Sequence, residues 1–378
     1  MNSQKRLHTD DFNSIINDIK RGIIHGSYES TSKVLTLISK LIKSNNYKSP
    51  RELMTILRYH GLNFQKEIQF EFVTINIIRR VLHRIRAIEK GQNEDDTDIQ
   101  ANEMYKLIHE KSTENPIQFD SFKAQLKLYM SDFEEEFKNF YETISEHGGQ
   151  FINDNEIILV FGKSKTVLEL LSGAQQSGKK FTVLIVNTLQ RNEGEEVQKE
   201  YQKRNITSFV VSESSLFSVL PSVNKIILSC HAVFGNGGII SMSGTYTLCN
   251  MAHHFLIPVY VCTGTYKICP TFPTNTNDYN LLQSPLSVMP EMLSSVTIGN
   301  NQKGLERVFD EDSKKVKKDD ENEIDINEAK YVRVINSTFD YIEPQMIHMF
   351  ISEDESFAPS YIYRHIAQLY NPEDTFFN

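Results

Sequence analysis

Residues 225–262 read KIILSCHAVFGNGGIISMSGTYTLCNMAHHFLIPVYVC. The stretch begins with one apolar run, Ile226 to Leu228, and ends with another, Ile257 to Val261, each typical of a buried strand. A glycine-rich loop follows the first run, and apolar residues at three- and four-residue spacing then predict a helix. Strand, glycine-rich loop, helix and strand form a βαβ unit, in which ligands bind at the carboxyl ends of the strands.

The same alternation extends on both sides of this unit, from about Glu156 to the C-terminus. Further strands are predicted at 157–161, 181–186, 208–211, 332–335 and 346–351, and further helices from Thr166 and at 195–203, 215–220 and 361–370. Strands that alternate with helices predict a mainly parallel sheet covered on both faces. We therefore expect an α/β domain over residues 151–378, with a solvated insertion at 301–328, where Lys, Asp and Glu are dense.

Residues 1–150 are predicted to form an all-helical domain. Four apolar stripes at helical spacing precede residue 90, and Ser49, Pro50 and Glu52 have the cap chemistry of a helix start. Residues 91–116 begin with an acidic stretch without periodicity and are predicted to form a linker or loop. A strongly aromatic stripe then predicts a long helix that ends at Gly148 and Gly149.

One of these helices carries a group of arginines beside its apolar stripe. The stripe contains Ile75, Ile78, Leu82 and Ile85, so the arginines are predicted to lie at its sides, where they can be changed without opening the core. The group consists of Arg79, Arg80, Arg84 and Arg86. Two interpretations stay open, a solvated basic flank and a docking surface for an acidic partner.

Composition excludes several classes of protein. The net charge of -9 over 378 residues argues against a general nucleic-acid binder. No window is apolar enough to span a bilayer, and the N-terminus lacks the apolar core of a signal peptide. The four cysteines have no CxxC spacing, which favours reduced thiols in a cytosolic protein over a zinc site. We expect no metal and no membrane contact.

Familiar phosphate-binding motifs are incomplete in this chain. Gly162, Lys163 and Ser164 resemble the end of a P-loop, but the required earlier glycine is Ile157, inside a predicted strand. The loop at 235–238 lacks the spacing of the dinucleotide fingerprint. Ser164 is compatible with an anion site or, more simply, with a helix cap.

Five blocks of the sequence, in order, resemble one known family. They are ILVFGKSKTVLELL, SFVVSESSLFSVLPSVNKIILSCHAVFGNGGIISMSGTY, IPVYVCTGTYKICPTFP, FDYIEPQMIHMFIS and APSYIYRHI. They are similar to the regulatory subunits of eukaryotic translation initiation factor 2B, above all to the beta members. The departure is at 353–357, where the family usually has a glycine pair. The resemblance implies a Rossmann-like sheet domain of the sugar-phosphate isomerase type behind the helical domain.

The same fold hosts sugar-phosphate isomerases, whose polar residues can be followed onto this chain. The resemblance places their cysteine at Gly162, their aspartate at Gly238 and their phosphate-binding arginine at Leu189. Because proton transfer needs a positioned acid or base, we expect no catalytic residue and no cofactor at this site. What remains is a vestigial site loop made of Gly162, Ser164, Asn236, Gly237, Gly238, Gly244 and Thr245.

The resemblance implies a non-catalytic, beta-type subunit of the guanine-nucleotide exchange factor for initiation factor 2, in the cytosol. Its partners would be the alpha, delta, gamma and epsilon subunits and initiation factor 2, whose alpha subunit it would help to bind and whose phosphorylation it would help to sense. Exchange itself would be carried out by epsilon, with gamma alongside. The alternatives are an isomerase or sugar-phosphate-binding relative, and the alpha or delta subunit of the same factor.

Overall fold

The computed structural model describes residues 9–21, 23–24, 26–68, 71–89, 119–188, 193–273 and 336–375. The predicted linker at 91–116, the predicted insertion at 301–328, the predicted strand at 332–335 and Leu189 lie outside these residues. No described helix is long and apolar enough to cross a bilayer.

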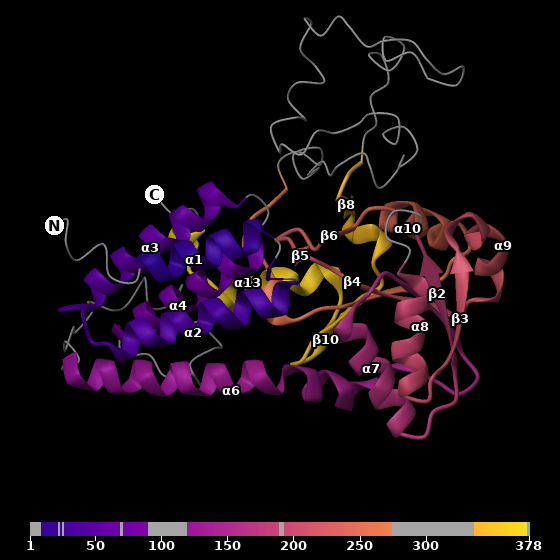
Figure 1. Cartoon of the computed structure of the whole chain (residues 1–378), viewed down its shortest axis with the longest axis horizontal. Coiled ribbons are helices and arrows are strands. Elements are labelled where there is room, and N and C mark those ends of the chain that lie inside the picture. The colour runs from indigo at the N-terminus through magenta and orange to yellow at the C-terminus, as the bar shows by residue number, and fades with distance from the viewer. Residues whose placement is uncertain are drawn as a thin grey trace, which may run out of the picture.

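The N-terminal part is helical, as predicted. It consists of α1 (Thr9–Lys20), α2 (Ser27–Lys43), α3 (Pro50–Glu67), α4 (Phe72–Glu89) and α6 (Phe119–Phe151). The hydroxyl of Ser49 accepts from the backbone N–H of Glu52 at 3.2 Å, which confirms the predicted cap of α3. Figure 1 shows α6 running beneath α2 and onward to the sheet, so one long helix joins the two parts of the molecule.

The glycine pair does not end α6, and this prediction was wrong. The helix continues through Gly148 to Phe151. Gly148 serves packing instead of termination, because a Cβ at this position would lie 2.1 Å from the carbonyl oxygen of Leu170. A Cβ on Gly173, in α7 (Lys165–Gln176), would lie 1.7 Å from the carbonyl oxygen of Ser145. The two glycines therefore let the backbones of α6 and α7 approach closely.

Within the described residues, the main sheet has seven strands in the order β10-β9-β7-β4-β1-β2-β3. They are β1 (Ile157–Phe161), β2 (Thr182–Asn187), β3 (Thr207–Ser212), β4 (Lys225–Ser229), β7 (Val259–Cys262), β9 (Met349–Ile351) and β10 (Ser356–Phe357). Every neighbouring pair is parallel except β9 and β10. The predicted fold class, a helical part followed by a mainly parallel sheet, is confirmed.

Both faces of this sheet are buried. Ile158 and Val160 of β1 belong to one hydrophobic cluster, while Leu159 and Phe161 belong to another, as alternation along a strand requires. The first cluster contains α7, α8 (Gly194–Lys203) and the N-terminal helices. The second contains α9 (Leu216–Val219), α10 (Thr245–His254) and α13 (Ile362–Leu369). The helical part thus shares a core with one face of the sheet, and the predicted division near residue 150 stays a prediction.

The glycine-rich stretch contains more structure than predicted. It holds β5 (Ala232–Val233) and β6 (Ile239–Met242), which form a second, antiparallel sheet with β8 (Phe339–Ile342). Residue pairs such as Ile239 and Ile342 join segments about a hundred residues apart. Strands of two and four residues are too short to give a periodic signal, which is why the sequence showed only a loop. The second sheet lies at the carboxyl ends of β4 and β7 and fixes the loop there.

Candidate functional site

The glycine loop, residues 235–238, is a turn held by its own atoms. Phe234 donates its backbone N–H to the carbonyl of Gly238 at 2.8 Å, and Gly237 adopts a φ of 82°. The Asn236 side chain accepts from the N–H of Gly238 at 3.0 Å and donates to the hydroxyl of Tyr341 at 2.7 Å. The polar atoms of the loop are therefore used to stabilise the turn itself.

Two glycines of the predicted vestigial site face space that other side chains fill. A Cβ on Gly238 would lie 2.3 Å from the Tyr341 hydroxyl oxygen. A Cβ on Gly162, whose φ is 76°, would lie 2.7 Å from the terminal methyl of Met242. Any larger residue at either position would displace the neighbouring side chain.

The helix ends at this site are capped by the chain. Ser164 accepts from the backbone N–H of Val167 at 3.3 Å and is the N-cap of α7, so the simpler of its two predicted roles is observed. A carboxylate oxygen of Asp340 accepts from the N–H groups of Gly244 and Tyr246 at 2.8 and 3.0 Å, at the start of α10. Thr245 is fully buried and donates to the carbonyl of Met242. The positive end of α10 is thus neutralised by a carboxylate of the chain.

Metal ligands and reactive thiols do not gather here. Among the described residues no cluster of three His, Cys, Asp or Glu side chains has the geometry to hold a metal ion. All four cysteines are buried and unpaired with one another. Burial raises the pKa of the Cys249 and Cys269 thiols to about 12, which keeps them protonated and unreactive.

The four arginines of α4 are packed against protein, and their predicted placement was wrong for Arg79. Its side chain is 3% exposed because the C-terminal segment covers it. The guanidinium donates to the backbone carbonyls of Asp374 and Thr375 at 3.2 and 2.7 Å, and to the side chain of Asn76 at 3.2 Å. Burial lowers the pKa of Arg79. Arg79 therefore cannot be changed without opening the core.

The other three arginines are partly buried and also have partners. The guanidinium of Arg80 lies 4.5 Å from the ring centre of Phe133, and that of Arg84 lies 5.2 Å from the ring centre of Tyr129. Both rings belong to α6, so these cations stack between α4 and α6. Arg86 points instead to the C-terminus. Geometry alone does not test partner binding by this group, which stays a prediction.

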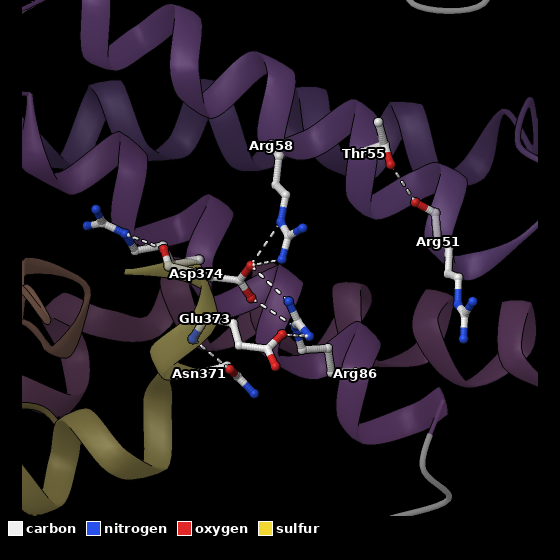
Figure 2. Close-up of polar contacts among 8 residues, drawn as sticks. Arg51, Thr55, Arg58, Arg86, Asn371, Glu373 and Asp374 are labelled. Atoms are coloured by element: carbon white, nitrogen blue, oxygen red, sulfur yellow. Dashed lines mark hydrogen bonds and ion pairs between the residues drawn. The ribbon is translucent and has the colours of Figure 1, made fainter. Parts of the chain in front are cut away.

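Figure 2 shows Arg58 of α3 and Arg86 of α4 converging on Asp374. The Asp374 side chain is fully buried and accepts from Arg58 at 2.6 and 3.0 Å and from Arg86 at 3.0 and 3.2 Å. We call Arg58, Arg79, Arg86 and Asp374 the C-terminal clamp. It attaches the last described turn of the chain, η11 (Pro372–Asp374), to helices some three hundred residues earlier.

A second link joins α4 to the end of β7. Arg80 donates to the Thr265 hydroxyl at 3.4 Å, and Thr265 donates its N–H and its hydroxyl to the Glu353 carboxylate at 3.0 and 2.6 Å. Burial, with a contribution from the charge of Asp354, raises the pKa of Glu353 to about 7. Glu353 lies in the segment where the sequence departs from the family, and the structure gives it a defined partner.

Sequence reasoning missed Asp340, Glu353 and Asp374, the three carboxylates that organise these contacts. Asp340 lies inside one of the quoted blocks and Glu353 in the segment at 353–357, but no pattern in the sequence marked the partners of these carboxylates. Each of the three meets its partner across about 90 residues or more. One signal was available for Asp374: Asn371, Pro372 and Glu373 have the residue types of a capped turn, and the side chain of Asn371 does accept from the Glu373 N–H at 2.9 Å.

Comparisons with known proteins decide the family. The Initiation factor 2 subunit family (IF-2B) matches residues 23–359. The chain belongs to this family. It is 26% identical to translation initiation factor eIF2B subunit beta of Dictyostelium discoideum, over 96% of this chain and 95% of that protein. The resemblance found in the sequence is thereby confirmed.

Solved structures agree on the fold. A crystal structure of eIF2B beta from Chaetomium thermophilum and one of the tetrameric eIF2B-beta2-delta2 complex from C. thermophilum give TM-scores of 0.68 and 0.66. Sequence identities are 20% and 18%; the matches cover 98% and 97% of this chain, and 96% and 98% of those chains. Family, relatives and fold together support a regulatory subunit of initiation factor 2B.

Proposed function

We propose that this chain is a beta-type, non-catalytic subunit of the cytosolic guanine-nucleotide exchange factor for translation initiation factor 2. The match to a beta subunit over nearly the whole of both chains carries the proposal. In this proposal the chain builds the complex and helps to sense phosphorylation of the alpha subunit of initiation factor 2. Exchange is carried out by the epsilon subunit, with gamma alongside.

The geometry of the glycine loop favours this role over the isomerase alternative. At the two positions where the related isomerases have a cysteine and an aspartate, this chain has Gly162 and Gly238. Met242 and Tyr341 fill the adjacent space, and Asp340 neutralises the helix end to which a phosphate would bind. A carboxylate beside a bound phosphate would repel it, so a sugar-phosphate sensor at this loop is disfavoured as well.

Sibling subunits are the first proposed partners. The chain is similar to a subunit of a tetrameric complex of beta and delta subunits, and from this we propose delta, alpha, gamma and epsilon as partners. Among the described residues, most of the large exposed apolar side chains lie in the α/β part. They are Phe209, Phe217, Tyr246, Leu256, Phe272, Tyr361 and Tyr363. Such side chains favour assembly through this part of the molecule.

Leu256 offers a sharp test of that surface. It is 85% exposed and has a left-handed φ of 56°, a conformation that favours glycine at the end of a helix such as α10. Leu256→Gly should therefore stabilise the free subunit by about 1 kcal/mol. If siblings cover the leucine, the same change should weaken assembly. If the variant is stabilised and assembles normally, Leu256 is excluded from the interface with the siblings.

The decisive experiment is affinity purification of the tagged chain, followed by identification of the subunits that co-purify. We expect the other four subunits together with initiation factor 2. The reconstituted complex should release GDP from initiation factor 2 faster than it does from the form phosphorylated on its alpha subunit, and the difference should shrink when this chain is left out. Recovery of the chain without any sibling, or turnover of methylthioribose 1-phosphate by the chain alone, would refute the proposal.

The arginines need a revised test of partner binding. Arg79 and Arg86 hold the C-terminus, so changing them alters the fold as well as the surface. Arg84→Gln removes a partly buried cation that stacks on Tyr129 and leaves the C-terminal clamp intact. If α4 docks an acidic partner, this variant should bind initiation factor 2 more weakly at low salt and equally at high salt. Unchanged binding at both salt concentrations excludes Arg84 from the docking surface.

A further inference from the structure

A hollow of about 290 Å³ lies between α2 and α6, and no residue of the glycine loop lines it. Its α2 wall includes Ser32, Leu35, Ser39 and Lys43, which repeat at three- to four-residue spacing on one face of the helix. Its α6 wall is formed by Glu134, Phe137 and Lys138. The volume is close to the lower end of the range for small-molecule sites in proteins.

Ser39 is the most informative residue in this hollow. It is 2% exposed, and its hydroxyl has no hydrogen-bond partner among the described residues. Other hydroxyls in the same helix are satisfied by the carbonyl four residues earlier: Thr31 bonds to Ser27 and Thr36 to Ser32. A buried hydroxyl without a partner is destabilising. Ser39 therefore has an unused donor beside a hollow large enough for a ligand.

The charge around the hollow is positive. Lys40, Lys43 and Lys138 line it together with a single carboxylate, Glu134, whose nearest approach to Lys43 is 3.9 Å. The described residues give Lys40 and Lys138 no ion pair. Lysines of this kind bind phosphate as point charges, and hydroxyl groups supply the shorter hydrogen bonds.

The floor of the hollow is apolar. Leu35 is 2% exposed and Phe137 is 6% exposed, and the ring of Tyr28 stacks on Phe137 with ring centres 4.6 Å apart. A bare inorganic anion would make no apolar contact with this floor. A ligand that joins a phosphate to a small apolar body would cover the floor and pair with the lysines at the same time.

We infer that the hollow between α2 and α6 is a binding site for a small phosphomonoester. The phosphate is held by Lys40 and Lys138 and accepts a hydrogen bond from Ser39, while the apolar body of the ligand rests on Leu35 and Phe137. The site is separate from the glycine loop, and its existence does not depend on the proposed role of the chain.

The test is titration of the full-length chain with phenyl phosphate, followed by ³¹P NMR or calorimetry, with inorganic phosphate as the second probe. Phenyl phosphate should saturate one site and bind more tightly than inorganic phosphate. The double variant Lys40→Gln with Lys138→Gln should bind at least about tenfold more weakly, and Ser39→Ala about fivefold more weakly. Melting temperatures should not fall, because the lysines are exposed and Ser39→Ala removes a buried hydroxyl without a partner, which should raise the melting temperature.

Lys33→Gln is the matched control, because Lys33 lies on α2, pairs with Glu29 at 3.1 Å and does not line the hollow. It should bind phenyl phosphate as the unchanged chain does. Equal loss in the control and the double variant would reveal general charge attraction and overturn the inference. The absence of saturable binding of phenyl phosphate at concentrations up to about 10 mM would also overturn it. Binding of a phosphoserine peptide without binding of phenyl phosphate would also overturn it, in favour of a protein ligand.

Discussion

The glycine loop and the C-terminal clamp differ in whether they contain buried charged side chains. At the loop, Gly162 and Gly238 offer no polar side chain, and Met242 and Tyr341 occupy the neighbouring space. At the clamp, a fully buried carboxylate is surrounded by guanidinium groups from α3 and α4. The sequence draws attention to the loop, whose motif is compact, and not to the clamp, whose members are about three hundred residues apart.

The difference teaches where this fold keeps its charged residues. Buried charges are costly unless each finds a partner, so they persist where they fix one geometry. Here they fix the C-terminus and the loop after β7 onto α4, which binds the helical part to the α/β part. Such internal rigidity is what the proposed role in building a complex would require.

Asp374→Ala should have the largest effect on stability. It leaves the guanidinium groups of Arg58 and Arg86 without their buried carboxylate, which should lower the free energy of unfolding by about 3 kcal/mol. Chemical denaturation measures the change. Glu373→Ala is the control, since Glu373 also pairs with Arg86 but is 70% exposed, and should cost less than about 1 kcal/mol. Equal losses in the two variants would mean that burial does not distinguish the clamp.

Gly238→Ala should destabilise the loop by about 2 kcal/mol, because the new methyl group would meet the Tyr341 hydroxyl. Combining it with Tyr341→Ala should recover part of this cost, and a double-mutant cycle from denaturation midpoints measures the coupling. Gly149→Ala is the control, since its Cβ would meet only the side chain of Ser177, at 3.0 Å from Oγ and 3.2 Å from Cβ. Strict additivity of the two substitutions would show that Tyr341 does not fill the space beside Gly238.

Glu353 should make stability fall as pH rises. Its pKa is about 7 in the folded chain and lies near 4.3 in an unfolded one, so the folded state holds the proton more strongly between these values. Stability is then greatest below the lower pKa and declines through about pH 4.5 to 7, by on the order of 1 kcal/mol. Thermal melting across this range, compared with Glu353→Gln, isolates the contribution. If the variant has the same slope, another group causes the dependence.

Ser164→Ala should have the smallest effect, a loss of about 0.5 to 1 kcal/mol from removal of the α7 cap. Because Ser164 only caps the helix, assembly with sibling subunits should be unchanged, as size-exclusion chromatography would show. Ser164→Asp retains a capping oxygen and should restore the stability. Loss of assembly in the alanine variant with normal stability would reveal a second role for this serine.

Part of the candidate site followed from the sequence. The chain positions of Gly162, Gly238 and Ser164 at strand ends were predicted, because a parallel sheet places its loops at one edge. The neighbours of these residues were not, since Met242 and Tyr341 reach the site through a second sheet whose strands are very short. Arg79 was misplaced because periodicity describes one helix, and the segment that buries it comes from the other end of the chain.

The sequence by itself determined the helices, the parallel strands and the family. Apolar periodicity is local, and each of the five matching blocks is an unbroken run of residues, so neither signal needs knowledge of distant contacts. Only the tertiary structure decided the partners of Asp340, Glu353 and Asp374, the close contact of Gly148 with α7, and the hollow beside Ser39. Each of these depends on which surfaces meet in space, and polar pairing and close packing across long separations leave no periodic trace in the chain.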